Sequence, residues 1–219
     1  MFDSKEIIED QIVIGDPSVF AIGYAFLGDD RCTELSMWVH GTNLLGFTKE
    51  GGRYTTRWPY LEDLVAWLNN FALSMADDPF PIDVDGEYAA EKDANARDHA
   101  PELDDGSSDE EMEAFDAYFD HFSDWTWDHT WHSESGGAIL SHMFFEYKDG
   151  MVELSWDNRG GTFGYEFDCE FGGTRVDAET FKAVVLEFVD AYERHWGIKV
   201  DDDSTWLRGS RAQEEGLTA

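Results

Sequence analysis

The chain is short of basic residues. Its 219 residues include only 15 lysines and arginines against 48 aspartates and glutamates, so its formal net charge is −33. A field of this sign repels nucleic acid and anionic membranes, and it draws cationic protein surfaces into fast encounter. The composition therefore argues against direct binding to nucleic acid or to a membrane. It predicts a basic protein, or the basic face of a nucleic-acid-binding enzyme, as the partner.

Cysteines and long apolar runs are also scarce. The only two cysteines, Cys32 and Cys169, are far apart and have no C-x-x-C spacing, a pattern typical of reduced thiols in a cytoplasmic protein. No apolar run approaches the roughly 18 residues that a membrane span needs. The first eleven residues are polar and do not resemble a signal peptide. We therefore expect a cytoplasmic location.

Aromatic residues, in contrast, are plentiful. The chain has 16 Phe, 9 Trp and 8 Tyr, and 42% of its residues are hydrophobic, which is more than a disordered acidic chain would contain. We predict a folded α+β protein with a largely antiparallel sheet, two or three packed helices and an acidic insert. The order of the elements also allows two β-meander-plus-helix halves.

Hydrophobic periodicity and turn residues divide the chain into four segments within one compact domain. Residues 1–75 are predicted to form a β-meander and a helix, 76–124 an acidic loop and an amphipathic helix, 125–199 a second hairpin or meander with a C-terminal helix, and 200–219 a polar tail. Asp177 as N-cap and Gly197 as stop define that last helix. The predicted strands are 19–27, 35–40, 44–48, 53–58, 143–148, 151–156 and 163–171.

Negative charge is concentrated in the middle of the chain. Residues 76–130 hold 19 acidic residues and only two basic ones, Lys92 and Arg97. The stretch 76–105 contains three prolines and is predicted to be a long loop. Ser108 and Glu111 have capping-box spacing, and the helix that follows has an aromatic face and a carboxylate face. The predicted partner-binding residues are Asp104, Asp105, Asp109, Glu110, Glu113, Asp116, Asp120 and Asp124.

A group of histidines provides an alternative site. Asp128, His129 and His132 lie close in sequence, and His142 follows, so they could supply ligands for zinc. The spacing includes no H-E-x-x-H motif, and tryptophans interleave with the histidines, which fits a half-buried aromatic cluster equally well. A further row, Glu166, Asp168 and Glu170 on one strand face, could chelate a cation or form a solvated sheet face.

Two stretches of the chain resemble a Trp-rich module associated with bacterial proteins that also carry an ImmA/IrrE-type zinc metallopeptidase domain. The first comprises LSMWVHGTNL at 35–44 and LEDLVAWL at 61–68. The second comprises WDH at 127–129, GG at 136–137, FF at 144–145 and VELSW at 152–156. The resemblance covers about half of the chain and implies a prokaryotic conflict or stress system. The H-E-x-x-H motif of the peptidase is missing, so no catalytic residue is carried over.

The leading hypothesis is a non-enzymatic, cofactor-free binding protein. Its charge resembles that of acidic nucleic-acid mimics and toxin-immunity proteins, so it would act as an inhibitor or an immunity protein of a defence system. One alternative is a metal-dependent hydrolase that uses Asp128, His129, His132 and His142. The other is an ordinary domain of a halophile, in which the whole proteome is acidic.

Overall fold

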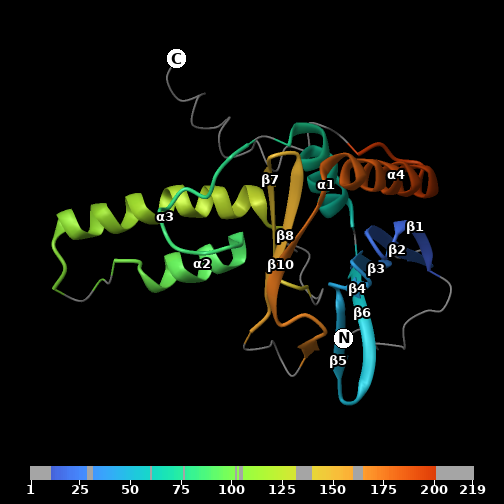
Figure 1. The fold of residues 1–219 in the computed structure, drawn as a ribbon, viewed down its shortest axis with the longest axis horizontal. Coiled ribbons are helices and arrows are strands. Elements are labelled where there is room, and N and C mark those ends of the chain that lie inside the picture. Colours follow the sequence, from blue (N-terminus) through green and yellow to red (C-terminus); the bar gives the residue numbers. More distant parts are fainter. Residues whose placement is uncertain are drawn as a thin grey trace.

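In the residues that it describes, the computed structural model shows two antiparallel sheets and four helices (Figure 1). It describes residues 11–28, 32–59, 61–75, 77–101, 103, 106–131, 140–159 and 165–200. The strands are β1 (Ile12–Asp16), β2 (Phe20–Leu27), β3 (Cys32–Val39), β4 (Thr42–Asn43), β5 (Gly46–Lys49), β6 (Gly52–Pro59), β7 (Met143–Lys148), β8 (Met151–Asp157), β9 (Glu166–Phe167) and β10 (Phe171–Asp177). The helices are α1 (Glu62–Ser74), α2 (Ala89–Asp98), α3 (Asp109–His129) and α4 (Ala178–Trp196).

The larger sheet has the strand order β1-β2-β3-β6-β5-β9, with β4 paired to β3. The smaller sheet has the order β10-β8-β7. Every pairing between the described strands is antiparallel. The predicted α+β class with a largely antiparallel sheet is thus confirmed.

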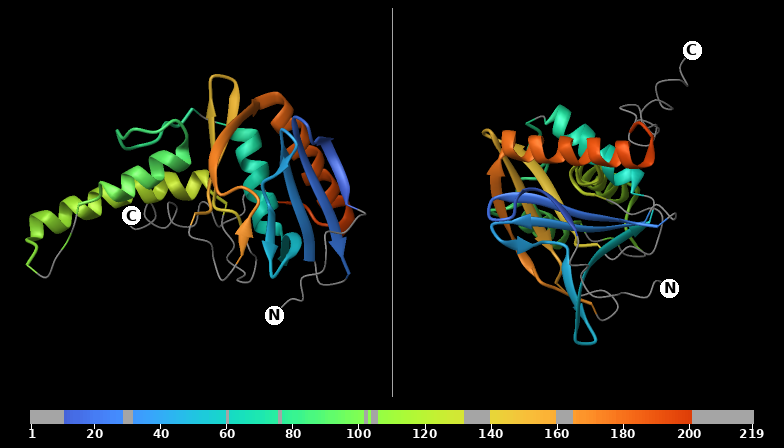
Figure 2. Two further views of the ribbon diagram at one scale, coloured as in Figure 1. Left: turned by 60° about the horizontal axis from the view of Figure 1, so that its bottom comes forward. Right: turned by 90° about the vertical axis from the view of Figure 1, so that its right-hand side faces the viewer.

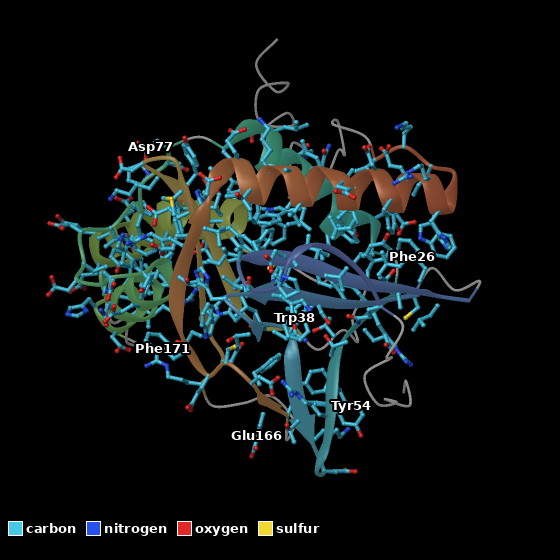
Figure 3. The ribbon with its side chains drawn as sticks, turned by 45° about the vertical axis from the view of Figure 1, so that its right-hand side comes forward. Phe26, Trp38, Tyr54, Asp77, Glu166 and Phe171 are labelled. Carbon is cyan, nitrogen blue, oxygen red and sulfur yellow. The ribbon has the colours of Figure 1, made fainter. Side chains whose placement is uncertain are left out.

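One hydrophobic core joins both sheets to α1 and α4. The face of β2 that carries Phe20 and Tyr24 packs on α4, where Phe20 lies 4.9 Å from Phe181 between ring centroids and Tyr24 lies 5.4 Å from Phe188. From the smaller sheet, Phe145 contacts the same Phe181 at 6.2 Å. Phe26 extends this contact to the C-terminal end of α4, where it stacks on His195 (Figure 3).

The helix predicted after Asp177 is confirmed as α4. The Asp177 carboxylate accepts a hydrogen bond from the Thr180 backbone N–H at 2.9 Å, and Gly197 ends the helix in the left-handed conformation with φ +65°. Both ends were predictable because the residues that fix them are local in sequence. The apolar stripe between them is buried on the sheets.

The stretch 76–105, which was predicted to be a loop, contains the helix α2. This helix has no apolar stripe, because its only hydrophobic residues are alanines. Its N-terminal N–H groups are capped from another element: Ala89 donates to the Glu153 carboxylate at 2.7 Å and Ala90 to the Ser155 hydroxyl at 3.1 Å, both on β8. The stabilising partners are more than sixty residues away in sequence, so local patterns could not reveal them.

The predicted strand 163–171 is wrong over its described part, residues 165–171. Only Glu166–Phe167 pairs with β5 as β9, and a new strand, β10, begins at Phe171. Asp168 leaves the ladder after donating its N–H to the Gly46 carbonyl, and its carboxylate pairs with Arg53 at 2.7 Å. Glu166, Asp168 and Glu170 therefore do not share one strand face, so they form neither of the two predicted alternatives, a cation site or a solvated sheet face.

Helices α2 and α3 lie on the side of the smaller sheet that faces away from α1 and α4, and α3 extends well beyond it (Figures 1 and 2). We call residues 77–129 the acidic arm. Near the sheet the arm has a small core of its own, in which Trp125 and Phe80 lie 4.7 Å apart and Phe144 of β7 completes the cluster. Strand alternation explains the arrangement, because Phe145 faces the main core while Phe144 faces the arm.

Candidate partner-binding surface

The predicted carboxylate face of α3 is present. The capping box forms as expected, with the Ser108 hydroxyl accepting from the Glu111 N–H and the Glu111 carboxylate accepting from the Ser108 N–H. At 3.6 residues per turn, six of the predicted residues fall within about one third of the helix circumference and span about 22 Å along the axis. We call these residues the carboxylate stripe: Asp109, Glu110, Glu113, Asp116, Asp120 and Asp124.

All six residues of the carboxylate stripe are exposed. Within the part of the chain that the structure describes, none of them forms an ion pair. Several are spaced at i, i+3 or i, i+4, so like charges lie one above another and destabilise the helix. The other two predicted binding residues, Asp104 and Asp105, lie outside the described residues.

The arm has only two cations, and both lie over aromatic rings of the arm itself. The Lys92 ammonium is 6.0 Å from the centroid of Phe80, and the Arg97 guanidinium is 4.9 Å from that of Phe122. Arg97 also pairs with Asp93 at 2.8 Å. These contacts place the positive charges beside the aromatic side of the arm, opposite the carboxylate stripe.

The aromatic side of α3 is covered unevenly. Phe122 and Trp125, near the sheet, are buried, whereas Phe115 and Phe119, farther out, are half-buried and Met112 is 41% exposed. The α2 helix supports the middle of α3 through the Tyr118 hydroxyl, which donates to the Ala96 carbonyl at 2.7 Å. The sheet-proximal end of the arm is therefore its best-packed part.

The arm is seated on the smaller sheet by polar and charged groups. Glu153, which caps α2, also pairs with Arg175 of β10 at 3.0 Å, and the Arg175 guanidinium lies 5.6 Å from the Tyr88 ring. Tyr88 in turn packs directly on Gly173, where a Cβ atom would come within 2.4 Å of the ring. This contact set was not predictable from local sequence patterns, because its members lie on three separate elements.

Glu146 faces Glu153 across the β7–β8 ladder. It is buried, with 4% of its surface exposed. Burial raises the pKa of its carboxyl above the ordinary value of 4.5, and the charge of Glu153 acts in the same direction, while Lys92 opposes the shift. The seat of the arm thus contains a carboxylate whose charge disfavours the folded state.

The structure describes three of the four residues of the predicted histidine site. The His129 ring is buried and stacks on Trp125 with centroids 4.1 Å apart, and its Nδ1 lies 2.8 Å from the Trp125 carbonyl. Burial lowers its pKa from the ordinary 6.5. Asp128 and His142 are exposed, and His132 lies outside the described residues. Among the described residues, no group of three or more His, Cys, Asp or Glu side chains could hold a metal ion.

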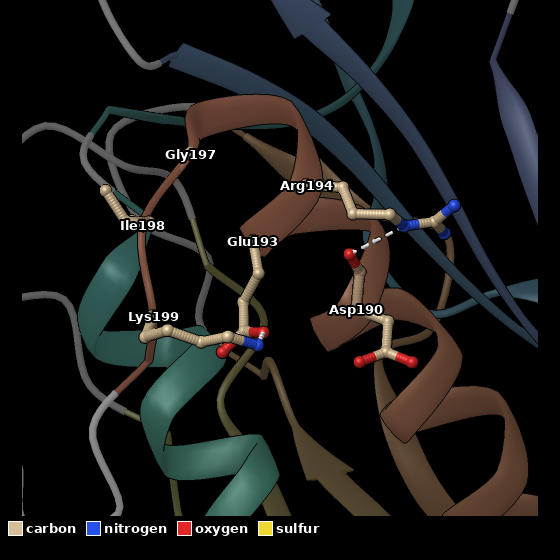
Figure 4. Close-up of a pocket in the computed structure, with 6 residues that line it drawn as sticks. All are labelled: Asp190, Glu193, Arg194, Gly197, Ile198 and Lys199. Atoms are coloured by element: carbon tan, nitrogen blue, oxygen red, sulfur yellow. Dashed lines mark hydrogen bonds and ion pairs between the residues drawn. The ribbon is translucent and has the colours of Figure 1, made fainter.

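A hollow of about 440 Å³ lies at the C-terminal end of α4 (Figure 4). Glu193 and Lys199 form an ion pair on one side of it, and Glu193 also accepts the Val200 N–H at 2.9 Å. The lining groups thus bind one another and fix the chain after Gly197.

In the described ranges, no helix is both long and apolar enough to cross a membrane.

Comparison with known proteins yields little. No family model matches the chain, and no curated protein matches it. Among solved structures, the crystal structure of CdiI from Burkholderia dolosa AUO158 is similar at a TM-score of 0.43 and 15% identity, over 82% of this chain and 99% of that one. A similarity of this degree carries no argument about function.

Proposed function

We propose that this protein is a non-enzymatic acidic binding protein, which occupies the basic surface of a partner protein with the carboxylate stripe of α3. The partner is a nucleic-acid-binding enzyme or a cationic toxin, so the protein would act as a nucleic-acid mimic or as an immunity protein. A cytoplasmic setting in a prokaryotic conflict or defence system, which the Trp-rich resemblance implies, belongs to this proposal.

One observation carries the proposal: six exposed carboxylates without ion pairs, among the described residues, lie on one face of a helix that extends beyond the sheets. Their mutual repulsion destabilises the isolated helix. A basic partner surface would reverse this effect. Its lysines and arginines, which otherwise hold phosphates, would pair with the carboxylates instead.

Affinity capture from the native host tests the proposal. The wild-type protein, used as bait, is compared with a variant in which four residues are changed to Lys: Glu110, Glu113, Asp116 and Asp120. We expect a captured basic protein to be lost at high salt, and to bind the variant at least a hundredfold more weakly because the attraction becomes repulsion.

The matched control carries the same change in net charge at four other exposed acids. Glu166 and Glu170, which lie near the β5–β9 pairing, and Glu187 and Asp190 on α4 are changed to Lys (Figure 3 labels Glu166). This control should retain most of the binding. If both variants weaken the complex equally, net charge alone governs the encounter and the proposed role of α3 is wrong. An unchanged complex with the α3 variant would also refute it.

A further inference from the structure

An exposed tryptophan lies on the acidic side of α3. Trp127 follows Asp120 by seven residues and Asp124 by three, which places its Cα on the same face of the helix as the carboxylate stripe. It is 41% exposed. The other aromatic residues of α3 that pack inward, Phe122 and Trp125 among them, lie on the opposite face. Trp127 also interacts with the rest of the chain, and its exposed part is the surface that a partner would meet.

The turn that presents Trp127 is held by buried neighbours on both sides of it in sequence. Its neighbour Trp125 is 4% exposed and donates its indole N–H to the Asp78 carbonyl at 3.0 Å. Two residues after Trp127, His129 is buried on Trp125. Thr130 then bridges to Phe144 of the smaller sheet. An anchor on a rigid turn loses little conformational freedom on binding, which favours affinity.

The protein itself shows which group fits an aromatic ring beside a carboxylate. Arg159 lies 3.9 Å from the Phe171 ring centroid while it pairs with Asp157 at 2.6 Å, on the surface near the start of β10 (Figure 3 labels Phe171). In the same way, Arg97 lies over the Phe122 ring and pairs with Asp93, and Arg175 lies over the Tyr88 ring and pairs with Glu153. Lys49 and Lys92 also lie over rings, 4.7 Å from Tyr165 and 6.0 Å from Phe80, but among the described residues neither forms an ion pair with a carboxylate. The cations that make both contacts are arginines, whose planar guanidinium can stack and form ion pairs at once.

We propose that Trp127 is the anchor of the partner interface, and that it receives an arginine side chain of the partner, which stacks on the indole while Asp120 or Asp124 pairs with its guanidinium. The inference rests on the proposed function and deepens it, because it assigns arginine rather than lysine chemistry to the partner surface. Tryptophan and arginine are also among the residues that are enriched at the hot spots of protein interfaces.

The test uses the full chain and two labelled peptides of equal length, polyarginine and polylysine, in fluorescence-anisotropy titrations at moderate salt. We expect wild type to prefer polyarginine by about tenfold. W127A should lose this preference while still binding polylysine, and W127F should keep part of it. F171A is the matched control, since Phe171 is 38% exposed but belongs to β10 and not to α3, and it should keep the full preference.

The outcomes separate this inference from the proposed function. If the α3 charge-reversal variant loses both peptides but W127A keeps the arginine preference, the stripe binds cations and the inference about Trp127 is wrong. If the charge-reversal variant binds both peptides like wild type, the proposed function itself fails. Self-association that disappears in W127A, without any arginine preference in wild type, would assign this face to a second copy of the chain and overturn the inference. Thermal denaturation of each variant confirms folding.

Discussion

Two buried glutamates lie where the arm meets the smaller sheet. Glu146 and Glu153 face each other on neighbouring strands, but their surroundings differ. Glu153 accepts the Ala89 N–H and pairs with Arg175, whereas for Glu146 burial outweighs the attraction of Lys92 and raises the pKa. One charge therefore stabilises the seat of the arm, and the other destabilises it.

We predict that Glu146→Gln stabilises the protein at pH 7 by about 1 kcal/mol, because it removes a buried charge and keeps the volume of the side chain. In wild type, the folded state binds a proton at Glu146 before the unfolded chain does. The free energy of unfolding therefore gains a contribution from this group as the pH falls through its raised pKa toward 4.5, and the variant lacks this contribution. Urea denaturation at pH 7 and pH 5 measures the stabilisation by Glu146→Gln and its pH dependence. Glu153→Gln, the control, should destabilise, and a destabilised Glu146→Gln would contradict the account.

His129 should produce the opposite pH dependence. Burial lowers its pKa below 6.5, so the unfolded chain takes up the proton first and stability falls as the pH drops below about 6.5. We expect His129→Gln to reduce the difference in unfolding free energy between pH 7.5 and pH 5.5, compared with wild type. NMR titration of the His129 ring is the direct measurement. A ring that titrates above 6.5 would show that the imidazole is stabilised in its charged form.

At the scale of elements, sequence patterns predicted what is fixed locally. The α4 helix has its cap, stripe and stop within one continuous segment, and the hairpin of β7 and β8 turns at Asp149 and Gly150, an Asp-Gly pair with positive φ. The α2 helix escaped prediction because its caps come from β8. The end of β9 escaped because Asp168 turns away to Gly46 and Arg53.

The carboxylate stripe was predictable from spacing alone, since exposure of one helix face follows from burial of the other. The seat of the arm was not predictable, because it depends on which face of the smaller sheet receives α2. Trp127 could have been found by its position relative to Asp120 and Asp124, had the helix been extended beyond residue 124.

The seat of α2 supplies a prediction for a whole element. Gly173→Ala places a methyl group against the Tyr88 ring, and we expect it to destabilise the protein by about 2 kcal/mol and to loosen α2. Hydrogen exchange of the α2 amides measures the loosening. In a Tyr88→Ala background the same change should cost much less, because the clashing ring is gone. Equal losses in both backgrounds would show that Gly173 is needed for another reason.

For the whole molecule, the surplus of 33 negative charges should make stability depend on salt. We predict that the protein is folded at physiological ionic strength, and that its melting temperature rises by a few degrees when salt screens the repulsion. The halophile alternative predicts a chain that is unfolded until salt reaches molar concentrations. Circular dichroism melts across a salt series distinguish the two.

The central claim is that the carboxylate stripe, and not acidity in general, forms the contact with a basic partner. The most direct test of this claim is to measure how the dissociation constant of the captured complex depends on salt. The double variant Asp116→Asn/Asp120→Asn is compared with the double variant Glu187→Gln/Asp190→Asn. The account predicts that the first pair weakens binding about tenfold or more at low salt, that the loss shrinks as salt rises, and that the second pair matches wild type. Equal affinities and equal salt dependences for the two pairs would contradict it.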